Sequence, residues 1–376
     1  MKNITVLGAG MVGSAIAKDL SRQYSVTAAD NSRERLERLK SQTDIQIQTA
    51  DLSDPDAVRV AIRGTDLVIG ALPGFMGFET LKTVIEAGKN IVDISFFGED
   101  PFLLDASARK NGVTAVVDFG VAPGMSNLIL GFWNARMRVE SFECLVGGLP
   151  AVRTWPFQYK APFSPVDVLE EYTRPARLVE NGMVVTRPAL SESEFVEFDG
   201  IGTLESFNTD GLRTLIETMK IPFMKEKTLR YPGHIDAIRI LRESGFLDAS
   251  VIQIGEARIR PIDVASKLLF PRWKLGETEP EFTVMRIVVR GMEENRLKEI
   301  TYSLMDRFDP ATGVSSMART TGYACTAAAR LVLEGKFDKK GIIPPERIGG
   351  DPLCFDQIMK DLKDRGVIYK KEERIP

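Results

Sequence analysis

The chain has 376 residues, more than one ordinary hydrophobic core needs, so we expect two domains. Hydrophobic residues make up 44% and charged residues 27%, with a net charge of -3, which indicates a soluble globular protein and argues against nucleic acid or an anionic membrane as a partner. No apolar run approaches the roughly 20 residues of a membrane span, and the chain opens on a strand without a signal sequence, so we expect a cytoplasmic protein. The three scattered cysteines show neither metal spacing nor a disulfide framework, and we expect no metal site.

The first strand and the turn after it form a dinucleotide-binding fingerprint. Residues 4–13 read ITVLGAGMVG, an apolar run followed by Gly8, Gly10 and Gly13 at G-x-G-x-x-G spacing. Gly8 permits the tight turn, Gly10 admits the pyrophosphate, and Gly13 lets the following helix pack on the strand. The amides at the start of that helix then bind the diphosphate. Cofactor contacts are therefore expected from Gly8, Gly10, Met11, Val12 and Gly13.

A second strand ends at Asp30, where the fingerprint places a carboxylate that binds the adenosine ribose. Asp30 repels a 2'-phosphate, which favours NAD as the cofactor. Arg33 and Arg35 lie just beyond Asp30 and Asn31 and would hold that phosphate if the Asp30 side chain turned away, so NADP remains the alternative.

Strands and helices alternate six times up to residue 118. Such alternation predicts an α/β fold with a doubly wound parallel sheet, a Rossmann domain, whose ligands bind beyond the carboxyl ends of the strands. The expected strands after Asp30 cover 45–50, 66–73, 90–94 and 113–118, and the helices cover 32–41, 55 onward, 78–87 and 101–110. Candidate polar or turn residues lie at these strand ends: Asp51, Leu72, Pro73, Asp93, Ser95 and Asp118. Asp51 reaches the adenine or caps a helix, and Leu72 with Pro73 passes under the nicotinamide.

The pattern changes after a helix at 125–137, and strands dominate. Strands are expected at 141–147, 176–180, 183–187, 251–260 and 282–291, with a hairpin turn at Asn181-Gly182. A long alanine-rich helix at 321–334 and a short helix at 356–365 close the chain. We expect a Rossmann domain at 1–125 that is completed by about 316–376, and an inserted substrate-binding and dimerisation domain at 126–315.

Polar loops between these strands supply candidate substrate residues. They lie at 147–150, 207–211 and 228–234, where glycine and proline expose the backbone. Arg230 either clamps a carboxylate or is an ordinary surface arginine. His234, the only histidine, either relays a proton or caps a helix. Asp210 fits a helix N-cap as well as a binding residue.

Several motifs resemble the saccharopine dehydrogenase family over nearly the whole chain. They are GAGMVG at the start, VDIS (92–95), DFGVAPGMSN (118–127), VGGLP (146–150), TLRYPGH (228–234) and GYACTAAARLVLEGKFDKKGIIPPE (322–346). Within the family the chain is most similar to the lysine 6-dehydrogenases, through residues 160–185 and 201–215. Saccharopine-forming members carry an arginine where this chain has Thr209, and that departure favours a smaller diamino acid.

The resemblance implies an inserted mixed-sheet α/β domain, a C-terminal helix that returns to the Rossmann domain, and a homodimer. It places Asp118 near the substrate amino group, Arg230 on the α-carboxylate and His234 near the reacting nitrogen. The substrate set is completed by Asn208, Thr209, Asp210 and Gly148.

These observations favour oxidative deamination of the ε-amine of L-lysine. The ammonium first loses a proton to His234, Asp93 or Asp118, a hydride then passes to the nicotinamide, and water releases ammonia and the semialdehyde. The alternative within the enzymes is an imine reductase of the saccharopine or carboxynorspermidine type. The alternative of another class is a dinucleotide-binding sensor without catalysis.

Overall fold

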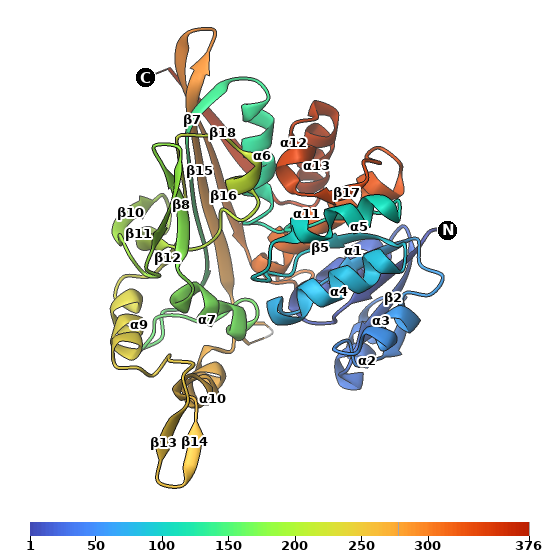
Figure 1. Ribbon diagram of the computed structural model, residues 1–376, viewed down its shortest axis with the longest axis horizontal. Helices are drawn as coiled ribbons and strands as arrows, with labels where there is room; N and C mark the ends of the chain where they lie inside the picture. The colour runs from blue at the N-terminus through green and yellow to red at the C-terminus, as the bar shows by residue number, and fades with distance from the viewer. Residues whose placement is uncertain (277, 376) are drawn as a thin grey trace.

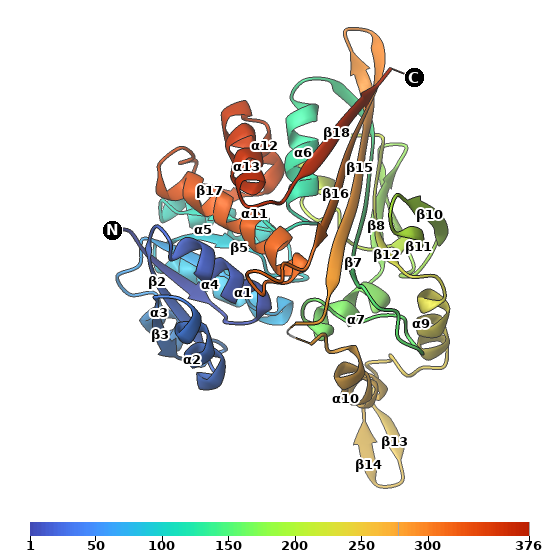
Figure 2. The same ribbon diagram turned by 180° about the vertical axis from the view of Figure 1, so that it is seen from behind.

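The computed structural model describes residues 1–276 and 278–375. Within these residues, two large sheets lie side by side (Figure 1). The first sheet has helices on both faces. The second sheet consists of long strands, and smaller helices and a projecting hairpin lie at one end of it. The same arrangement seen from behind shows the C-terminal helices between the two sheets (Figure 2).

The first sheet is parallel throughout and confirms the predicted Rossmann domain. Among the described residues it has seven strands in the order β17-β6-β5-β4-β1-β2-β3. Its elements are β1 (Asn3–Leu7), α1 (Met11–Leu20), β2 (Ser25–Asp30), α2 (Arg33–Gln42), β3 (Gln46–Thr49), α3 (Pro55–Ala61), β4 (Leu67–Gly70), α4 (Gly74–Glu86), β5 (Asn90–Asp93), η1 (Pro101–Leu104), α5 (Asp105–Lys110), β6 (Thr114–Val116) and β17 (Gly341–Ile343).

Local sequence explains where several of these helices begin. Asp54 caps α3 by accepting from the Asp56 amide at 3.0 Å, and Pro55 occupies the first helical position. Ser32 caps α2 by accepting from the Arg35 amide. Helix α1 differs, because its N-cap Gly10 offers no side chain and leaves the first turn without a side-chain cap.

The second sheet is mixed, as predicted for the inserted domain. Strand β12 (Phe223–Arg230) pairs in parallel with β7 (Arg138–Pro150), and the other pairs are antiparallel. The order is β10-β11-β12-β7-β15-β16-β18, with β8 beside β12 and β9 beside β8. The remaining strands are β8 (Ala176–Glu180), β9 (Met183–Arg187), β10 (Glu194–Phe198), β11 (Gly202–Asn208), β15 (Glu281–Glu293), β16 (Arg296–Arg307) and β18 (Tyr369–Arg374).

Shorter elements surround this sheet. They are α6 (Met125–Asn134), α7 (Pro165–Thr173), α8 (Leu215–Thr218), α9 (His234–Glu243), the hairpin β13 (Ile252–Ile254) with β14 (Ala257–Ile259), and α10 (Pro261–Trp273). The hairpin turn at Asn181-Gly182 is confirmed, and both residues have positive φ. The strand expected at 251–260 was wrong, since the chain turns back within it.

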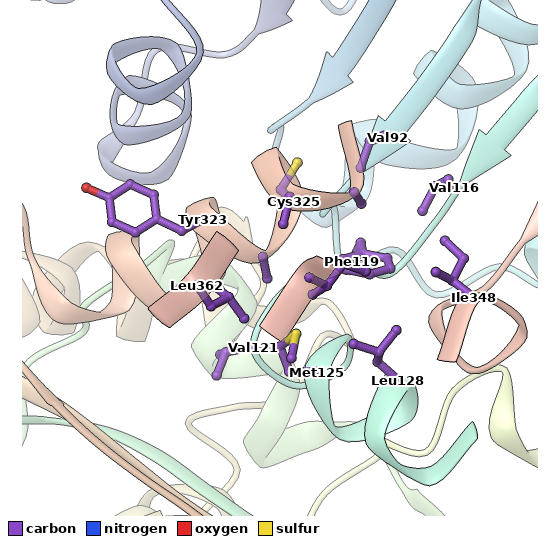
Figure 3. Close-up of a cluster of buried hydrophobic side chains, with 14 of the residues drawn as sticks. Val92, Val116, Phe119, Val121, Met125, Leu128, Tyr323, Cys325, Ile348 and Leu362 are labelled. Carbon is purple, nitrogen blue, oxygen red and sulfur yellow. The ribbon is translucent and has the colours of Figure 1, made fainter. Parts of the chain in front are cut away.

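The C-terminal segment contains α11 (Ser316–Leu333), α12 (Pro345–Gly349) and α13 (Pro352–Asp364). Figure 3 shows how this segment packs against the first domain: Cys325 of α11 and Ile348 of α12 lie among Val92, Val116 and Phe119. The long helix expected at 321–334 is thereby confirmed as a helix that returns to the first sheet. The expectation that all of 316–376 belongs there was wrong for 369–374, because β18 pairs with β16 in the second sheet. Pro376 lies outside the described residues.

Candidate active site

One cleft of about 1630 Å³ connects the glycine-rich turn to the second sheet. Its first-domain wall is formed by residues that follow β1, β4 and β6, and its second-domain wall by β7, α7, β12 and α10. Of the residues expected from the sequence, the following line the cleft: Gly8, Gly10, Met11, Val12, Gly13, Asp30, Leu72, Pro73, Asp118, Gly148, Thr209, Asp210 and Arg230.

The glycine-rich turn has the geometry that a dinucleotide requires. Gly8 has φ +103°, and a Cβ there would lie 2.4 Å from the Ala71 carbonyl oxygen. A Cβ on Gly13 would lie 2.1 Å from the Gly8 carbonyl oxygen, so the helix packs directly on the turn. A Cβ on Gly10 would meet nothing within 4 Å. Together with the uncapped first turn of α1, this open space fits a bound diphosphate.

Asp30 is held in place beside this turn. Its Oδ2 accepts from the Ala9 amide at 2.7 Å and its Oδ1 from the Ser32 amide at 2.8 Å. The carboxylate is 7% exposed and lines the cleft, where a ribose hydroxyl would donate to it. Arg35 also lines the cleft and would be available to the 2'-phosphate of the alternative cofactor.

The structure does not bring Asn31, Arg33 or Asp51 to the cleft. Asn31 is exposed, and Arg33 points along α2, where it pairs with Glu37 four residues later. Asp51 is exposed and accepts from the Ser53 hydroxyl at 2.6 Å, a bond that lowers the pKa of this aspartate. Asp51 therefore closes a local turn in this structure, and cofactor contacts from Asn31, Arg33 and Asp51 stay predictions.

Arg230 is buried at the substrate end of the cleft, inside the second domain. Its Nε donates to the Tyr172 hydroxyl at 3.1 Å, its Nη1 to the Leu229 carbonyl at 2.9 Å, and its Nη2 to the Glu171 carboxylate. A guanidinium has five N–H donors, so two remain for a ligand. Arg230 is thus positioned by the protein before any substrate arrives.

Asp118 lies on the opposite wall and pairs with Arg213. The Arg213 Nη2 is 3.1 Å from Asp118 Oδ1, and both side chains are buried. The Arg213 Nη1 also donates to the Phe97 carbonyl. Asp118 therefore faces the cleft with its charge already balanced.

Asp93 is enclosed below Asp118 and does not line the cleft. Its Oδ1 accepts from the Ser95 amide at 2.8 Å, and burial raises its pKa to about 8. The expectation that Asp93 takes a proton from the substrate is therefore wrong in this geometry, because the carboxyl does not reach the substrate space.

His234 is fully buried behind Arg230 and also does not line the cleft. Its Nδ1 lies 2.7 Å from the Phe157 carbonyl oxygen, which requires that nitrogen to donate. Its Nε2 then accepts from the Tyr172 hydroxyl at 2.8 Å. Burial, with help from the Arg230 charge, lowers the pKa of the ring to about 3. The histidine expected to relay a proton is instead a neutral support for Tyr172.

The residues of the 207–211 segment divide between the cleft and the interior. Asn208 is buried away from the cleft, and its Nδ2 donates to the Ser191 hydroxyl at 3.2 Å. Thr209 lines the cleft and its hydroxyl accepts from that of Thr228 at 3.1 Å. Asp210 lines the cleft but is held by Arg177, with Nε 2.8 Å from Oδ1.

Gly148, the remaining expected residue, lies where the cleft is narrow. A Cβ on it would lie 2.6 Å from the Met317 Cε and equally close to Pro162.

Glu171, Arg174 and Glu226 are among the charged residues of the cleft that were missed from the sequence. Glu171 pairs with Arg230, and burial raises the pKa of this glutamate. Arg174 pairs with Glu170 through Nη2 at 3.0 Å, while its buried Nη1 has no hydrogen-bond partner among the described residues. The Arg174 guanidinium lies 5.0 Å from the centroid of the Phe96 ring. The signal available in the sequence was the group of closely spaced acidic residues in α7, the helix that holds Glu171.

Residues 1–276 and 278–375 lack two kinds of feature. No group of three or more histidine, cysteine, aspartate or glutamate side chains there is arranged to hold a metal ion. No helix in those residues is both long enough and apolar enough to span a membrane.

Comparisons with known proteins agree along the chain. Residues 4–116 match the family model for the saccharopine dehydrogenase NADP binding domain, and residues 120–367 match the model for the saccharopine dehydrogenase C-terminal domain. The first domain is therefore a nicotinamide dinucleotide-binding domain, as the glycine-rich turn indicates.

Curated relatives are distant but extend over the whole chain. The glutamate-forming saccharopine dehydrogenase of Saccharomyces cerevisiae is 23% identical over 449 residues, covering 100% of this chain and 99% of the relative. The mitochondrial alpha-aminoadipic semialdehyde synthase of Mus musculus is 22% identical over 462 residues, and this chain spans 48% of its length. A carboxyaminopropylagmatine dehydrogenase of Synechocystis is 18% identical and is covered to 94%.

Among solved structures, the apo saccharopine dehydrogenase of Saccharomyces cerevisiae superposes with a TM-score of 0.79 at 21% identity, covering 100% of both chains. This likeness confirms the fold. Since the two family models together cover most of the chain in the expected order, the chain belongs to the saccharopine dehydrogenase family.

Proposed function

We propose that this chain is a nicotinamide dinucleotide-dependent dehydrogenase that oxidatively deaminates the ε-amine of L-lysine, with NAD preferred over NADP. One observation carries the proposal: a single cleft joins the dinucleotide turn to charged groups of both signs. An amino acid with a second amine carries one carboxylate and two ammonium groups, and this lining offers a partner for each kind. When bound, the dinucleotide supplies the hydride acceptor, and the protein supplies position and charge.

Two arginines of the cleft have donors to spare for the substrate α-carboxylate. Arg230 keeps two N–H groups beyond its protein partners, and the Nη1 of Arg174 has no partner among the described residues. A guanidinium held by its neighbours binds a carboxylate with little loss of side-chain freedom.

Acidic side chains provide for the cationic end. Glu171, Glu226, Asp118 and Asp210 all line the cleft. Three of these acids pair with arginines, as described above, and Glu226 is an additional acid. An acid at the cleft without a protein cation favours a substrate that carries a second ammonium group in addition to the one beside its carboxylate.

A dehydrogenase acting on a secondary amine is the second candidate. Two of the relatives named above are dehydrogenases of saccharopine and of carboxyaminopropylagmatine. Lys267 of α10 and Lys274, which directly follows α10, also line the cleft and would bind a further carboxylate. Thr209, in place of the arginine of saccharopine-forming members, favours the smaller substrate.

The test is reduction of NAD and NADP by the purified chain with L-lysine, ornithine, saccharopine or carboxynorspermidine. The proposal expects turnover with lysine and release of one ammonia per reduced cofactor. Turnover only with a secondary amine would replace it with the second candidate. Binding of the cofactor without turnover of any amine would indicate the sensor.

A further inference from the structure

Glu226 is the most unusual charged residue of the cleft. It lies on β12, is 3% exposed and lines the cleft. Its Oε2 is buried and has no hydrogen-bond partner within residues 1–276 and 278–375. A buried carboxyl oxygen without a partner costs stability, so its presence in the cleft requires another explanation.

The neighbouring backbone provides space for this side chain. A Cβ on Gly211 would lie 1.7 Å from Glu226 Oε1, so a side chain at 211 would displace the carboxylate. The Glu226 carbonyl accepts from the Thr209 amide at 3.2 Å, which fixes the strand beside that glycine. Glu226 is thus held at the cleft by fixed backbone on one side.

Among the described residues, the four charged groups that most affect Glu226 each have a partner of opposite sign. From α7 comes Glu171, which Arg230 of β12 holds. From the segment after β11 come Asp210, held by Arg177, and Arg213, which holds Asp118 after β6. None of these cations is left over for Glu226, so its ionised form would find a counter-cation only outside the protein.

We propose that the Glu226 carboxylate binds the side-chain ammonium of the substrate and accepts its proton before hydride transfer. The inference rests on the proposed function and names the residue that performs its first step. One N–H bond of the ammonium breaks and one O–H bond forms on Glu226, leaving a neutral amine. The carbon next to that amine then loses a hydride to the oxidised dinucleotide. Water adds to the resulting iminium, the C–N bond breaks to give the aldehyde and an ammonium ion, and Glu226 returns its proton to solvent.

The electrostatics of the site give this role a pH signature. Burial, and next the charge of Glu171, raises the pKa of Glu226 to about 8. The free enzyme therefore holds a neutral Glu226 below that pH and a carboxylate above it. Since only the carboxylate accepts a proton, kcat/KM for lysine should rise as the pH passes about 8.

The experiment measures kcat/KM for lysine from acid to alkaline pH in the wild type and in Glu226→Gln, Glu226→Asp and Glu143→Gln. Glu143 lies on the adjacent strand β7, pairs with Lys225 at 2.9 Å and does not line the cleft, so it is the matched control. In Glu226→Gln, kcat/KM for lysine should fall at least about 100-fold at alkaline pH, and the rise of kcat/KM with pH should disappear. Its affinity for the reduced cofactor, followed by fluorescence, should not change.

Glu226→Asp keeps the charge on a shorter side chain, so it should be slower and retain the rising limb. Glu143→Gln should behave as the wild type. An active Glu226→Gln variant with an unchanged pH profile would overturn the role of Glu226 and leave the proposed function standing. A Glu226→Asp variant whose kcat/KM no longer rises with pH would do the same. A wild type that does not turn over lysine would overturn both.

Discussion

Asp118 and Arg213 join the first sheet to the second domain through a bidentate ion pair, with Nε 3.2 Å from Oδ2 and Nη2 3.1 Å from Oδ1. Asp118 follows β6, and Arg213 follows β11. Both residues have positive φ, near +50°, and both are buried. The left-handed backbone at both positions accompanies the meeting of these two charges at the wall of the cleft.

Removal of one partner from this pair should destabilise the protein strongly. Arg213→Met leaves Asp118 buried without its cation, so we expect the free energy of unfolding to fall by about 3–5 kcal/mol. Urea unfolding measures this change. The double variant Asp118→Asn with Arg213→Met should lose less free energy of unfolding, because no buried charge is left unpaired.

Arg59→Ala, at an exposed pair with Asp56, is the control and should change the free energy of unfolding by less than about 1 kcal/mol. Equal losses in Arg213→Met and Arg59→Ala would contradict the assignment.

Two alanine substitutions in the glycine-rich turn should have opposite consequences. Gly13→Ala places a Cβ against the Gly8 carbonyl oxygen and should lower Tm. Gly10→Ala meets nothing in the protein and should leave Tm unchanged, but its methyl group enters the diphosphate space. We expect Gly10→Ala to weaken binding of the reduced cofactor by at least about 10-fold. Thermal unfolding and fluorescence titration of both variants test this, and a Gly10→Ala protein with native affinity would place the diphosphate elsewhere.

His234 should make the protein sensitive to acid. Its folded pKa of about 3 lies below the ordinary 6.5, so the unfolded chain binds the proton more tightly. The stability that this residue contributes is complete above about pH 6.5 and is lost as the pH falls toward 3, by up to about 4 kcal/mol. His234→Gln should therefore lose less free energy of unfolding between pH 7 and pH 4 than the wild type does. A steeper acid loss in the variant would show that the ring is charged in the folded state.

Glu226 should lower stability in the opposite pH range. Its folded pKa of about 8 lies above the ordinary 4.5, so the stability associated with its protonated form is present below pH 4.5 and lost as the pH rises to 8. Glu226→Gln, which cannot ionise, should raise the free energy of unfolding at pH 8 relative to the wild type, by at most about 4 kcal/mol. Denaturant titrations at pH 5 and pH 8 test this. A variant that is less stable than the wild type at pH 8 would contradict burial of an unpaired carboxylate.

Arg174 should distinguish substrates that carry a carboxylate from those that do not. If its unpartnered Nη1 binds the α-carboxylate, Arg174→Gln should raise KM for lysine by about 10-fold or more. Turnover of cadaverine, which has the same amine and no carboxylate, should be weak in the wild type and unchanged by the substitution. Steady-state kinetics with both amines decide this, and equal effects on the two would assign Arg174 to the fold instead.

The sequence predicted the features whose physics is local. Gly8, Gly10 and Gly13 follow a strand at a spacing with one geometric meaning, and the structure confirms that turn. Asn181-Gly182 specifies a hairpin by backbone conformation alone. The cytoplasmic location and the homodimer depend on other molecules and stay predictions.

The substrate end could not be predicted, because burial there is made by distant segments. Glu226 stands in the run FMKEKTLR, whose alternating charges resemble a solvated strand, yet α7 and the 209–213 segment enclose it. His234 attracted attention as the only histidine, whereas Trp273 of α10 and Tyr172 of α7 pack against its ring. The type of a side chain and its position in the sequence did not reveal whether it would point into the cleft, into the core or toward solvent.

The late strand β18 has a mechanical consequence. Within the described residues the backbone passes between the two sheets three times: after β6, between β16 and α11, and between α13 and β18. A domain connected by one linker can rotate in many directions. A domain connected by three linkers can rotate only about an axis that bends all three linkers together. We therefore expect opening of the cleft to be limited to a rocking motion, whose amplitude should respond to stiffening of any one linker.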